Sequence, residues 1–566
     1  MEARTPDSWL ARNWGHCAAV LVAIASYLTA LGGEPIWDDT IVFERFLPAF
    51  RSFADVFLPP EGTGELGQVY YRPFITASYL LDNWLYGTDS FVGHHLTTLA
   101  FHVLSVLGTA WIARAMSGNE PAARWAAIAA ALCFAVHPVH VESVAQISGR
   151  SDTSATAFLL GSLLLLMHGR DRPQLRWPWP LAAGAFLAAL FCKEVSIAGA
   201  LLGALLLWLP RRTPTAVWWR FAWSYGIAFA IYLALRAGAK LGRAPFAEQS
   251  AATAVGNLLR AVGYDAKFLL LPMDQAAFVP IAMTPPIWFG TICVLATLVA
   301  GVFAWRGRES RPILTLAWCW LSITAAPSLA LVFVKASEQL VAERYLYLPS
   351  VAVSLAFGWL VAVLARRTGK VRVIAVVVAI LTAAGAVTTA LRARIYRDEE
   401  AFWADTVARA PGAALPLHEF GLARRKAGRL DEAMALLQQA LELYDDDEGR
   451  SLAQNTIGTI CLERREWSEA ERWFEQASAT RPNYETAWFN LAMVYGMRAE
   501  TRRGPQNSPD LGDIERCVAA LTKAVRIRSN YDKARFQLAR NSLVLSKVYL
   551  VHRRLDDARR LREEAK

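Results

Sequence analysis

Long apolar segments fill the first two thirds of the chain and then stop near residue 392. A helix needs about 20 consecutive apolar residues to cross a bilayer, and about eleven segments approach that length. Only 19% of the residues are charged, below the roughly 25% that is typical of soluble proteins. The sequence therefore predicts an all-α chain, with a polytopic membrane domain over residues 1–391 and a soluble helical domain over residues 392–566.

The expected membrane spans are 14–33, 94–116, 122–140, 152–169, 177–192, 195–209, 217–237, 287–305, 312–334, 349–365 and 371–391. The pair 177–192 and 195–209 is short and is interrupted by "CKE", so an arrangement with ten spans stays open. We expect the first span to be an uncleaved anchor rather than a signal peptide, because its apolar run is long and further spans follow it.

The distribution of Lys and Arg predicts the orientation, because these residues mark the cytoplasmic loops of membrane proteins. They fill alternate connections, from Arg4 and Arg12 before the first span to the basic run at 366–372. The N-terminus is therefore expected inside, and the intervening connections outside. The apolar segment 252–271 contains charged residues, so we expect an interfacial or re-entrant helix there. The net charge of +10 then reflects the inside loops, and nucleic acid is not an expected partner.

The region after residue 392 contains an internal repeat. "RPNYETAWFNLA" at 481–492 returns as "RSNYDKARFQLA" at 528–539. Small residues recur with one shared spacing at Gly421, Ala433 and Ala440, and at Gly458, Ala470 and Ala477. Small side chains at that spacing let two antiparallel helices touch, which is the tetratricopeptide pattern. About three to four repeats are expected, and their groove would serve either as a scaffold or for the recruitment of a peptide substrate.

Ionisable residues gather at the span ends that are expected to face outward. They are Asp38, Asp39 and Arg72 in the first outward connection, His137, His140, Glu142, Arg150 and Asp152 in the second, Lys193 and Glu194 in the third, and Glu343, Arg344 and Tyr347 in the last. Such residues at membrane depth are costly and usually mark a functional site. We expect these connections to meet in one polar site on the outer side.

The residue types at these span ends indicate phosphate binding. Arginines can hold a phosphate through two parallel hydrogen bonds, and a lysine can hold it as a point charge. Carboxylates beside such cations are either ion-pair partners or a general base. A lipid-linked phosphate is the natural candidate on the outer side, where a nucleotide is not expected. The seven cysteines show no CxxC pair or framework spacing, so neither disulfides nor a zinc site is expected.

Five short motifs follow one another along the chain: "WDD" after the first span, then "YYRPF", "HPVHVESV…GR", "CKE" and "AERYLYLPS". In this order, and with the repeats behind them, they resemble the transmembrane and tetratricopeptide repeat-containing O-mannosyltransferases over nearly the whole chain. The resemblance implies a membrane fold of the glycosyltransferase C class and transfer of mannose from a polyprenyl (dolichyl) phosphate to Ser or Thr of proteins. The chain departs from that pattern in its small number of repeats, in "WDD" and in "CKEVS", which leaves the acceptor open.

Joined to this resemblance, the residues predict a mechanism. An acceptor hydroxyl needs a base when it attacks the anomeric carbon, and Asp38 or Asp39 would take its proton, with inversion. Adjacent side chains on an extended segment point to opposite faces, so one aspartate would face the substrate and the other would fix the loop; the sequence does not say which. The expected ligands of the donor phosphate and sugar are Arg72, His137, His140, Glu142, Arg150, Lys193, Glu194, Glu343, Arg344 and Tyr347. A divalent metal is a weaker alternative, and its candidate ligands are Asp38, His137, His140 and Glu142.

The expected partners are a polyprenyl (dolichyl)-phosphate sugar donor, a protein or peptide acceptor in the repeat groove, and membrane lipids. We expect a multi-pass protein of a bacterial inner membrane with periplasmic repeats, or with lumenal repeats in a eukaryote. Two alternatives stay open: the same fold could glycosylate a lipid or a glycan, or the chain could be a non-enzymatic scaffold anchored in the membrane. The peptide-sized groove speaks against the first, and the polar outward cluster speaks against the second.

Overall fold

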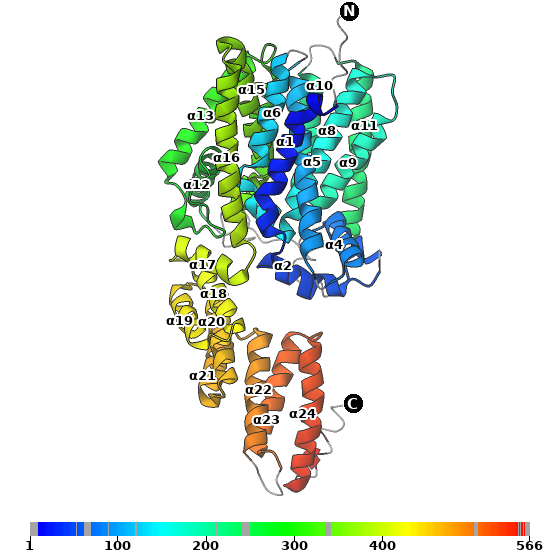
Figure 1. Ribbon diagram of the computed structural model, residues 1–566. Helices are drawn as coiled ribbons and strands as arrows, with labels where there is room; N and C mark the ends of the chain where they lie inside the picture. The colour runs from blue at the N-terminus through cyan, green and yellow to red at the C-terminus, as the bar shows by residue number, and fades with distance from the viewer. Residues whose placement is uncertain are drawn as a thin grey trace, which may run out of the picture. The chain divides into compact units, whose positions relative to one another are not determined.

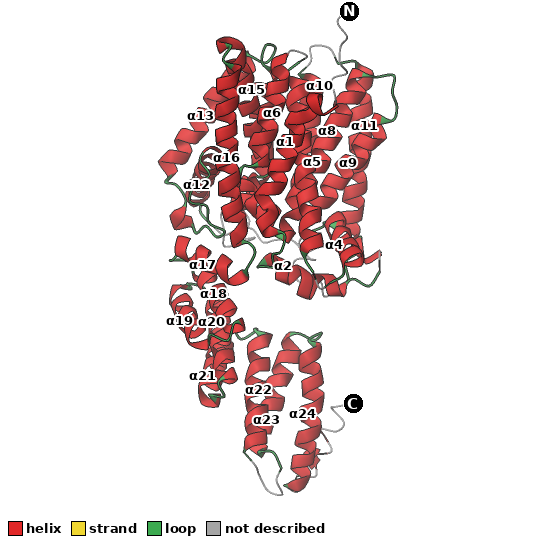
Figure 2. Ribbon diagram, viewed as in Figure 1, coloured by secondary structure: helices red, strands yellow, loops and turns green. Residues whose placement is uncertain are grey.

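Figure 1 follows the chain of a computed structural model. The described residues are 9–52, 54–60, 70–88, 90–118, 121–209, 213–239, 249–333, 341–502, 508–552, 554, 556–558 and 560. Within them every regular element is a helix, which confirms the predicted all-α class (Figure 2). The chain forms two compact units, Met1–Phe402 and Trp403–Lys566.

The first unit is a bundle of long helices with several short helices at one end (Figure 1). Its long helices are α1 (Trp9–Tyr27), α5 (Val92–Met116), α6 (Pro121–Ala135), α8 (Arg150–Asp171), α9 (Pro178–Cys192), α11 (Thr215–Gly238), α12 (Ala251–Leu270), α13 (Ile287–Arg306), α14 (Pro312–Leu329), α15 (Ser350–Thr368) and α16 (Val371–Ile395). The shorter helices are α2 (Asp38–Ile41), α4 (Pro73–Tyr86), α7 (Val141–Ala145) and α10 (Ala198–Trp208), and α17 (Glu399–Arg409) begins in this unit.

Six described helices are long and apolar enough to cross a membrane. They are α5, α11, α13, α14, α15 and α16, and each coincides with an expected span. The number rises to seven if α6 and the segment Pro138–Ala145, which are bent by 50° relative to each other, form one broken span. These helices indicate a multi-pass integral membrane protein.

The other expected spans correspond to α1, α8, α9 and α10, which do not meet this criterion. α9 and α10 have 15 and 11 residues, fewer than the about 20 that a crossing helix ordinarily needs. α8 has 22 residues, but its first turns hold Arg150, Asp152 and several Ser and Thr side chains, which are buried among neighbouring helices. A helix that contacts protein on most sides does not need an apolar surface. Its length and hydropathy therefore do not show whether it crosses the membrane.

Small residues let the helices of this unit approach closely. α6 is rich in alanine, and a Cβ atom on Gly358 of α15 would come 2.4 Å from the carbonyl oxygen of Ala126. Contact through small side chains is typical of membrane helices, because packing rather than the hydrophobic effect holds them together. α5 contacts both α6 and α8, so α5, α6, α8 and α15 form the interior of the unit.

One end of the unit gathers several helix ends that are far apart in the sequence. Thr29, just after α1, donates a hydrogen bond to the carbonyl of Ala390 in α16 (3.2 Å). Thr389 donates to the carbonyl of Val136, just after α6 (2.9 Å). α2 and α4 lie at the same end (Figure 1). The fold therefore brings together connections that the sequence predicts to face outward.

The helix α4 presents an apolar face to its surroundings. Leu81, Trp84 and Leu85 are more than half exposed, and Trp84 is 79% exposed, whereas Asp82 between them is buried. An amphipathic helix with an exposed tryptophan is typical of a membrane interface. α4 begins directly after Arg72, so the position of α4 determines the position of that arginine.

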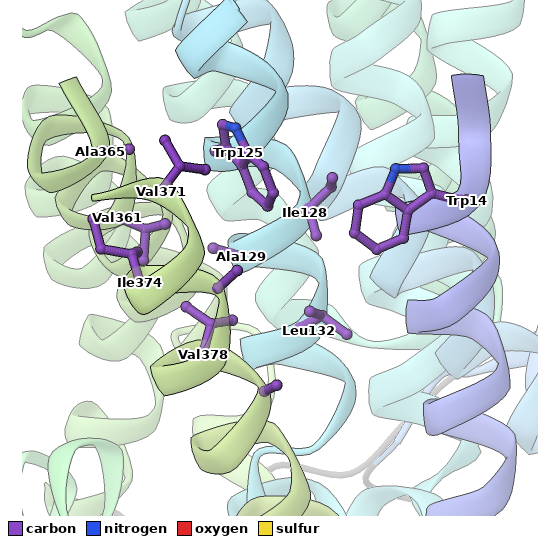
Figure 3. A pocket seen from close by; sticks show the side chains of 12 residues that line it. Trp14, Trp125, Ile128, Ala129, Leu132, Val361, Ala365, Val371, Ile374 and Val378 are labelled. Carbon is purple, nitrogen blue, oxygen red and sulfur yellow. The ribbon is translucent and has the colours of Figure 1, made fainter. Parts of the chain in front are cut away.

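An apolar recess lies between α1, α6, α15 and α16 (Figure 3). Trp14, Trp125, Ile128 and Val378 line it together with smaller aliphatic side chains, and the two tryptophan rings meet edge to face with centroids 6.4 Å apart. None of the described residues that line the recess is ionisable. The recess therefore offers no group for acid–base chemistry or for phosphate binding.

The second unit consists of antiparallel helix pairs. Its helices are α18 (Ala414–Lys426), α19 (Leu430–Leu443), α20 (Asp447–Glu463), α21 (Trp467–Thr480), α22 (Glu485–Thr501), α23 (Leu511–Ile527) and α24 (Asp532–Val551). A Cβ atom on Gly421 would lie 2.8 Å from Leu437, and one on Gly458 would lie 2.8 Å from Phe474. These glycines stand where the two helices of a pair cross, as the spacing of small residues predicts.

Candidate functional site

Asp38 and Asp39 open the short helix α2, and the residue before them has an unusual backbone conformation. Trp37 has φ 52° and ψ −115°, which residues other than glycine rarely adopt and which tends to occur at functional sites. Asp39 is 1% exposed, whereas the side chain of Asp38 is 30% exposed. The two carboxylates therefore face different surroundings, the protein interior and the surface of the site.

Asp39 holds the connection between α7 and α8. Its carboxylate accepts hydrogen bonds from the backbone N–H groups of Ile147 (3.1 Å) and Ser148 (2.7 Å). The connection is tight, since a Cβ atom on Gly149 would come 2.6 Å from the carbonyl oxygen of Ser143. Asp39 thus ties the connection after α1 to the connection between α7 and α8. Burial raises the pKa of Asp39 to about 6, against the lowering effect of these hydrogen bonds and with a further rise from the charge of neighbouring Asp38.

We expect this raised pKa to appear as a pH-dependent stability difference between the wild-type chain and Asp39→Asn, which cannot titrate. The folded-state pKa lies above that of an unfolded carboxyl, so the folded chain binds the extra proton, and stability falls as the pH rises from about 4 to about 6. Thermal unfolding midpoints measured across that range should show the wild type losing stability relative to Asp39→Asn as the pH rises.

Asp171→Asn is the matched control for this measurement, because Asp171 on α8 is an exposed carboxylate. Its midpoints should follow those of the wild type at every pH. If the curve for Asp39→Asn also runs parallel to the wild type, burial does not raise the pKa of Asp39.

Arg344 connects Asp38 with Glu142. Its Nη1 atom lies 2.8 Å from Asp38 Oδ2 and 3.5 Å from Glu142 Oε1, and its backbone N–H donates to Glu142 Oε2 (2.9 Å). Glu142 is buried, so it holds the arginine from the interior. Burial alone would lower the pKa of Arg344, but the charges of Asp38 and Glu142 outweigh it and hold that pKa well above its ordinary value. Asp38 is therefore a partly exposed carboxylate beside a fixed cation.

Lys193 lies in the break between α9 and α10. Its Nζ atom is 2.6 Å from Asp152 Oδ1, and both side chains are buried. The backbone is extended at Lys193, so the next side chain points the other way, and Glu194 Oε2 lies 3.1 Å from Arg72 Nη2. Arg72 thus contacts the residue that follows Lys193, and Lys193 and Arg344 both lie near the ring of Tyr345. These three cations therefore share one neighbourhood.

Two tyrosine rings accompany these cations. The guanidinium carbon of Arg72 lies 4.3 Å from the ring centroid of Tyr70. The ring of Tyr345 lies 5.6 Å from Lys193 Nζ and 5.9 Å from the guanidinium carbon of Arg344. An aromatic face attracts a cation without neutralising it. The rings therefore help to hold the three cations in place without adding negative charge to the site.

Arg150 is placed differently from the other three predicted phosphate-binding cations. It is wholly buried at the start of α8, where its guanidinium donates to Thr98 Oγ1 (3.2 Å), Ser78 Oγ (3.0 Å) and the carbonyl of His94 (2.7 Å). Its Nη2 atom also lies 2.6 Å from Asp82 Oδ2. Arg150 thus joins α4, α5 and α8, and this position gives no support to its predicted contact with a phosphate.

His137, His140 and Tyr347 lie inside the bundle. His137 Nε2 contacts a backbone carbonyl of α12 at 3.1 Å, and His140 Nε2 contacts Ser350 Oγ at 2.7 Å. The hydroxyl of Tyr347 lies 2.7 Å from His102 Nδ1. These contacts connect α5, α12 and the start of α15. The three predicted donor ligands therefore belong to an interior polar network rather than to the exposed cations.

The structure does not form the metal site considered for Asp38, His137, His140 and Glu142. In the part of the chain that the structure describes, no three His, Cys, Asp or Glu side chains are close enough together to hold an ion. Asp38 and Glu142 both contact Arg344, whereas the two histidines are engaged in the interior. These four described residues therefore do not form one set of metal ligands. Glu343, the remaining predicted ligand, is buried as well.

Sequence reasoning did not select two residues that complete this region. Asp82 is the buried partner of Arg150, and Arg236, near the end of α11, is a second cation beside Glu194. Each of them is an ionisable residue near the end of an apolar segment, which is the same signal that selected the others. The sequence does not show which segment ends meet in space.

Comparison with known proteins finds relatives of this chain and a match to its repeats. Residues 412–483 match the tetratricopeptide repeat family, which confirms the predicted repeats. The protein O-mannosyl-transferase Tmtc2 of Drosophila melanogaster is 32% identical over 200 residues, or 32% of this chain and 20% of that protein. The protein O-mannosyl-transferase TMTC4 of Homo sapiens is 27% identical over 465 residues, or 70% of this chain and 62% of that protein. The chain is a distant homologue of these proteins.

The similarity to the human protein covers 70% of the chain, so it extends well into the membrane unit, because Trp403–Lys566 makes up less than a third of the chain. This homology with protein O-mannosyl-transferases suggests a glycosyltransferase. The chain spans less than two thirds of the length of either of these relatives.

The solved structures that match this chain have low sequence identity to it. MamA is 17% identical and covers 30% of this chain and 79% of its own, with a TM-score of 0.22. YrrB, described as a TPR protein with an unusual peptide-binding site, is 17% identical and covers 29% of this chain and 90% of its own, also with a TM-score of 0.22.

Proposed function

We propose that this chain is an integral-membrane glycosyltransferase that moves a sugar, expected to be mannose, from a polyprenyl-phosphate donor to Ser or Thr hydroxyls of proteins. The observation that carries the proposal is Asp38, a partly exposed carboxylate 2.8 Å from Arg344. Lys193 and Arg72 lie in the same neighbourhood and provide further positive charge for a phosphate. Homology with protein O-mannosyl-transferases supports the reaction class.

The cations Arg72, Lys193 and Arg344 would hold the phosphate of the donor. When the bond between sugar and phosphate breaks, the leaving polyprenyl phosphate gains a negative charge. Cations that contact it therefore stabilise the transition state more than the bound substrate. The structure pairs each of the three with a carboxylate, so donor binding would exchange one set of ion pairs for another. The polyprenyl chain would remain in the membrane.

Asp38 would act as the general base. The acceptor hydroxyl gives its proton to the Asp38 carboxylate while its oxygen attacks the anomeric carbon, and the bond from that carbon to the phosphate oxygen breaks. A single displacement of this kind inverts the anomeric centre. Contact of Arg344 with the phosphate would weaken its ion pair with Asp38 and leave the carboxylate free to accept the proton. Asp39, whose oxygens hold the backbone between α7 and α8, would position Asp38 without touching the substrate.

We place the N-terminus in the cytoplasm and count about eleven crossings in a glycosyltransferase C-like arrangement, with α9 and α10 each counted as one. The membrane domain, 1–391, is then followed by the repeat domain, 392–566, on the outer side with Asp38. The C-terminal end of α16 supports this side, because it lies beside Thr29 and Val136 at the end that carries the site. The outer side would be the periplasm in a bacterium or the lumen in a eukaryote.

Incubation of the purified full chain with radiolabelled polyprenyl-phosphate mannose and Ser/Thr-containing peptides tests the proposal. Label is expected on the peptide, with an inverted anomeric configuration. Transfer to a lipid or glycan in place of the peptide would assign the chain to that acceptor class. Absence of transfer to any acceptor would contradict the enzymatic proposal and favour a membrane-anchored scaffold.

Removal of residues 412–566 should separate donor use from acceptor capture. The proposed donor site consists entirely of residues before 391, so donor binding and slow donor hydrolysis should persist. The KM for a protein acceptor should rise, because the repeats would contribute binding energy that does not change during the reaction. Arg344→Ala should do the reverse, with a raised KM for the donor and little change for the acceptor.

Both kinetic constants, measured for both variants, check this division of labour. If the truncated chain stays monodisperse but loses donor binding as completely as Arg344→Ala, the repeats are part of the catalytic fold and the two domains do not act separately.

A further inference from the structure

The ion pair between Arg72 and Glu194 has a third member. Arg236 lies near the C-terminal end of α11, and its Nη1 atom is 3.8 Å from Glu194 Oε1. Arg72 Nη2 lies 3.1 Å from the other oxygen, Oε2. Two arginines therefore bracket one carboxylate, each on its own oxygen. We refer to Arg72, Glu194 and Arg236 as the double-arginine site.

The double-arginine site is accessible, as is the pair of Arg344 and Asp38. The side chains of Arg72, Glu194 and Arg236 are 24%, 32% and 34% exposed. The pairs formed by Lys193 and Arg150 are buried on both sides. Exchange of a partner for a ligand costs less in an accessible pair than in a buried pair, because the displaced carboxylate can enter water.

The double-arginine site also has hydrogen-bonding capacity that its own members leave unused. Among the described residues, neither Arg72 Nε nor Glu194 Oε1 has a hydrogen-bond partner, although both atoms are buried. The 3.8 Å contact between Arg236 and Glu194 is too long for a hydrogen bond, and Arg236 Nη1 donates instead to the Tyr232 hydroxyl at 3.3 Å. Glu194 therefore fills the space between the arginines without satisfying them.

The charge and the surroundings of this site indicate the class of ligand. Once Glu194 is displaced, two guanidinium groups face the ligand, and a phosphodiester is an anion that offers one free oxygen to each of them. The planar donors of arginine suit its two free oxygens. Ile197 and Leu201 follow Glu194 closely in the chain and expose aliphatic side chains one helical turn apart along α10. A lipid chain attached to the phosphate would find an apolar surface there.

We propose that Arg72 and Arg236 bind the phosphodiester of a lipid-linked sugar, and that the Glu194 carboxylate occupies this binding site until the ligand displaces it. The inference rests on the proposed function for the identity of the donor; it adds Arg236 as a binding residue and makes Glu194 a competitor. Small free anions bind too weakly to displace the carboxylate. A ligand that is also held by its lipid chain can displace it.

Equilibrium binding of radiolabelled polyprenyl-phosphate mannose to the detergent-solubilised full chain, without acceptor, tests this inference. Arg236→Gln is expected to weaken binding at least about tenfold, because a charge-assisted hydrogen bond is lost. Arg236→Lys should recover part of the loss. Glu194→Gln keeps the shape of the side chain but removes the competing charge, so it is expected to strengthen binding. Arg220→Gln, at the other end of α11, should bind as the wild type does.

Three results would overturn the inference. If Arg236→Gln binds the labelled lipid as tightly as the wild type does, Arg236 does not contribute to the binding site. Weaker binding by Glu194→Gln would show that Glu194 braces Arg72 and does not compete with the ligand. Displacement of the labelled lipid by an equal concentration of dimethyl phosphate, a water-soluble phosphodiester, would show that the site takes free anions.

The transfer assay separates this inference from the proposed function. If the binding results hold and no sugar is transferred to any acceptor, the proposed function fails and the double-arginine site stands. If transfer occurs and Arg236→Gln binds the donor as the wild type does, the function stands and the site fails.

Discussion

Asp38→Asn is expected to lower kcat for sugar transfer by about 10²–10⁴-fold while folding and donor binding change little. A general base contributes a factor of about this size, and asparagine has the same shape but cannot take the proton. Asp38 is partly exposed, so its replacement leaves the interior intact, and Arg344 keeps Glu142 as a partner. Measurements of kcat, donor affinity and thermal midpoint on the same preparation check the prediction.

Asp39→Asn is the matched control, because it makes the same chemical change one residue away. It removes an acceptor from the backbone N–H groups of Ile147 and Ser148, so its main effect should be on stability. Asp38→Glu should retain part of the activity, since a carboxylate remains. Full turnover in Asp38→Asn combined with its loss in Asp39→Asn would reverse the roles of the two aspartates. Full turnover in both would mean that the pair is structural.

Arg150→Met is expected to destabilise the membrane unit by about 3–5 kcal/mol, because removing one partner of a buried ion pair leaves the other charge uncompensated. Asp82 would lose its 2.6 Å contact, and the acceptors Thr98, Ser78 and the His94 carbonyl would lose a donor. These contacts join three helices, so their loss affects the packing of α4, α5 and α8 together. The free energy of unfolding in a denaturant series measures the effect.

Asp82→Asn in the Arg150→Met background should recover part of this loss, because a neutral amide does not need a compensating charge. Arg306→Met, at the exposed end of α13, is the control and should change the free energy of unfolding by less than about 0.5 kcal/mol. If Arg150→Met costs as little as Arg306→Met, the buried network does not hold these helices together.

The class of the fold can be predicted from the sequence because apolar runs are a local signal. α5, α11, α13, α14, α15 and α16 each coincide with an expected span. The expected spans that the structure does not support by length and hydropathy include α8, which is surrounded by protein in place of lipid. α8 carries Arg150 and Asp152 in its first turn, and their partners come from α4 and from the break after α9. No single segment reveals such partners.

The sequence predicts which residues gather at the candidate site. It does not predict which of these residues contact one another. Arg72, Lys193 and Arg344 lie in one neighbourhood, as their positions at span ends suggest. The different surroundings of the two aspartates depend on the backbone of Trp37, whose positive φ no sequence preference would predict for a tryptophan. The direction of a side chain at such a turn follows from the tertiary structure.

Through α4, the candidate site is connected to a surface that is typical of a membrane interface. Arg72 precedes the first residue of α4, and the same helix exposes Trp84 to the surroundings. An interfacial helix of this kind is drawn to the depth of the lipid headgroups, and that depth changes with bilayer thickness. The buried pair of Asp82 and Arg150 ties α4 to α8, which also holds Lys193 through Asp152. We therefore expect a change of bilayer thickness to strain the Asp82–Arg150 pair before it alters the distance between Arg72 and Lys193.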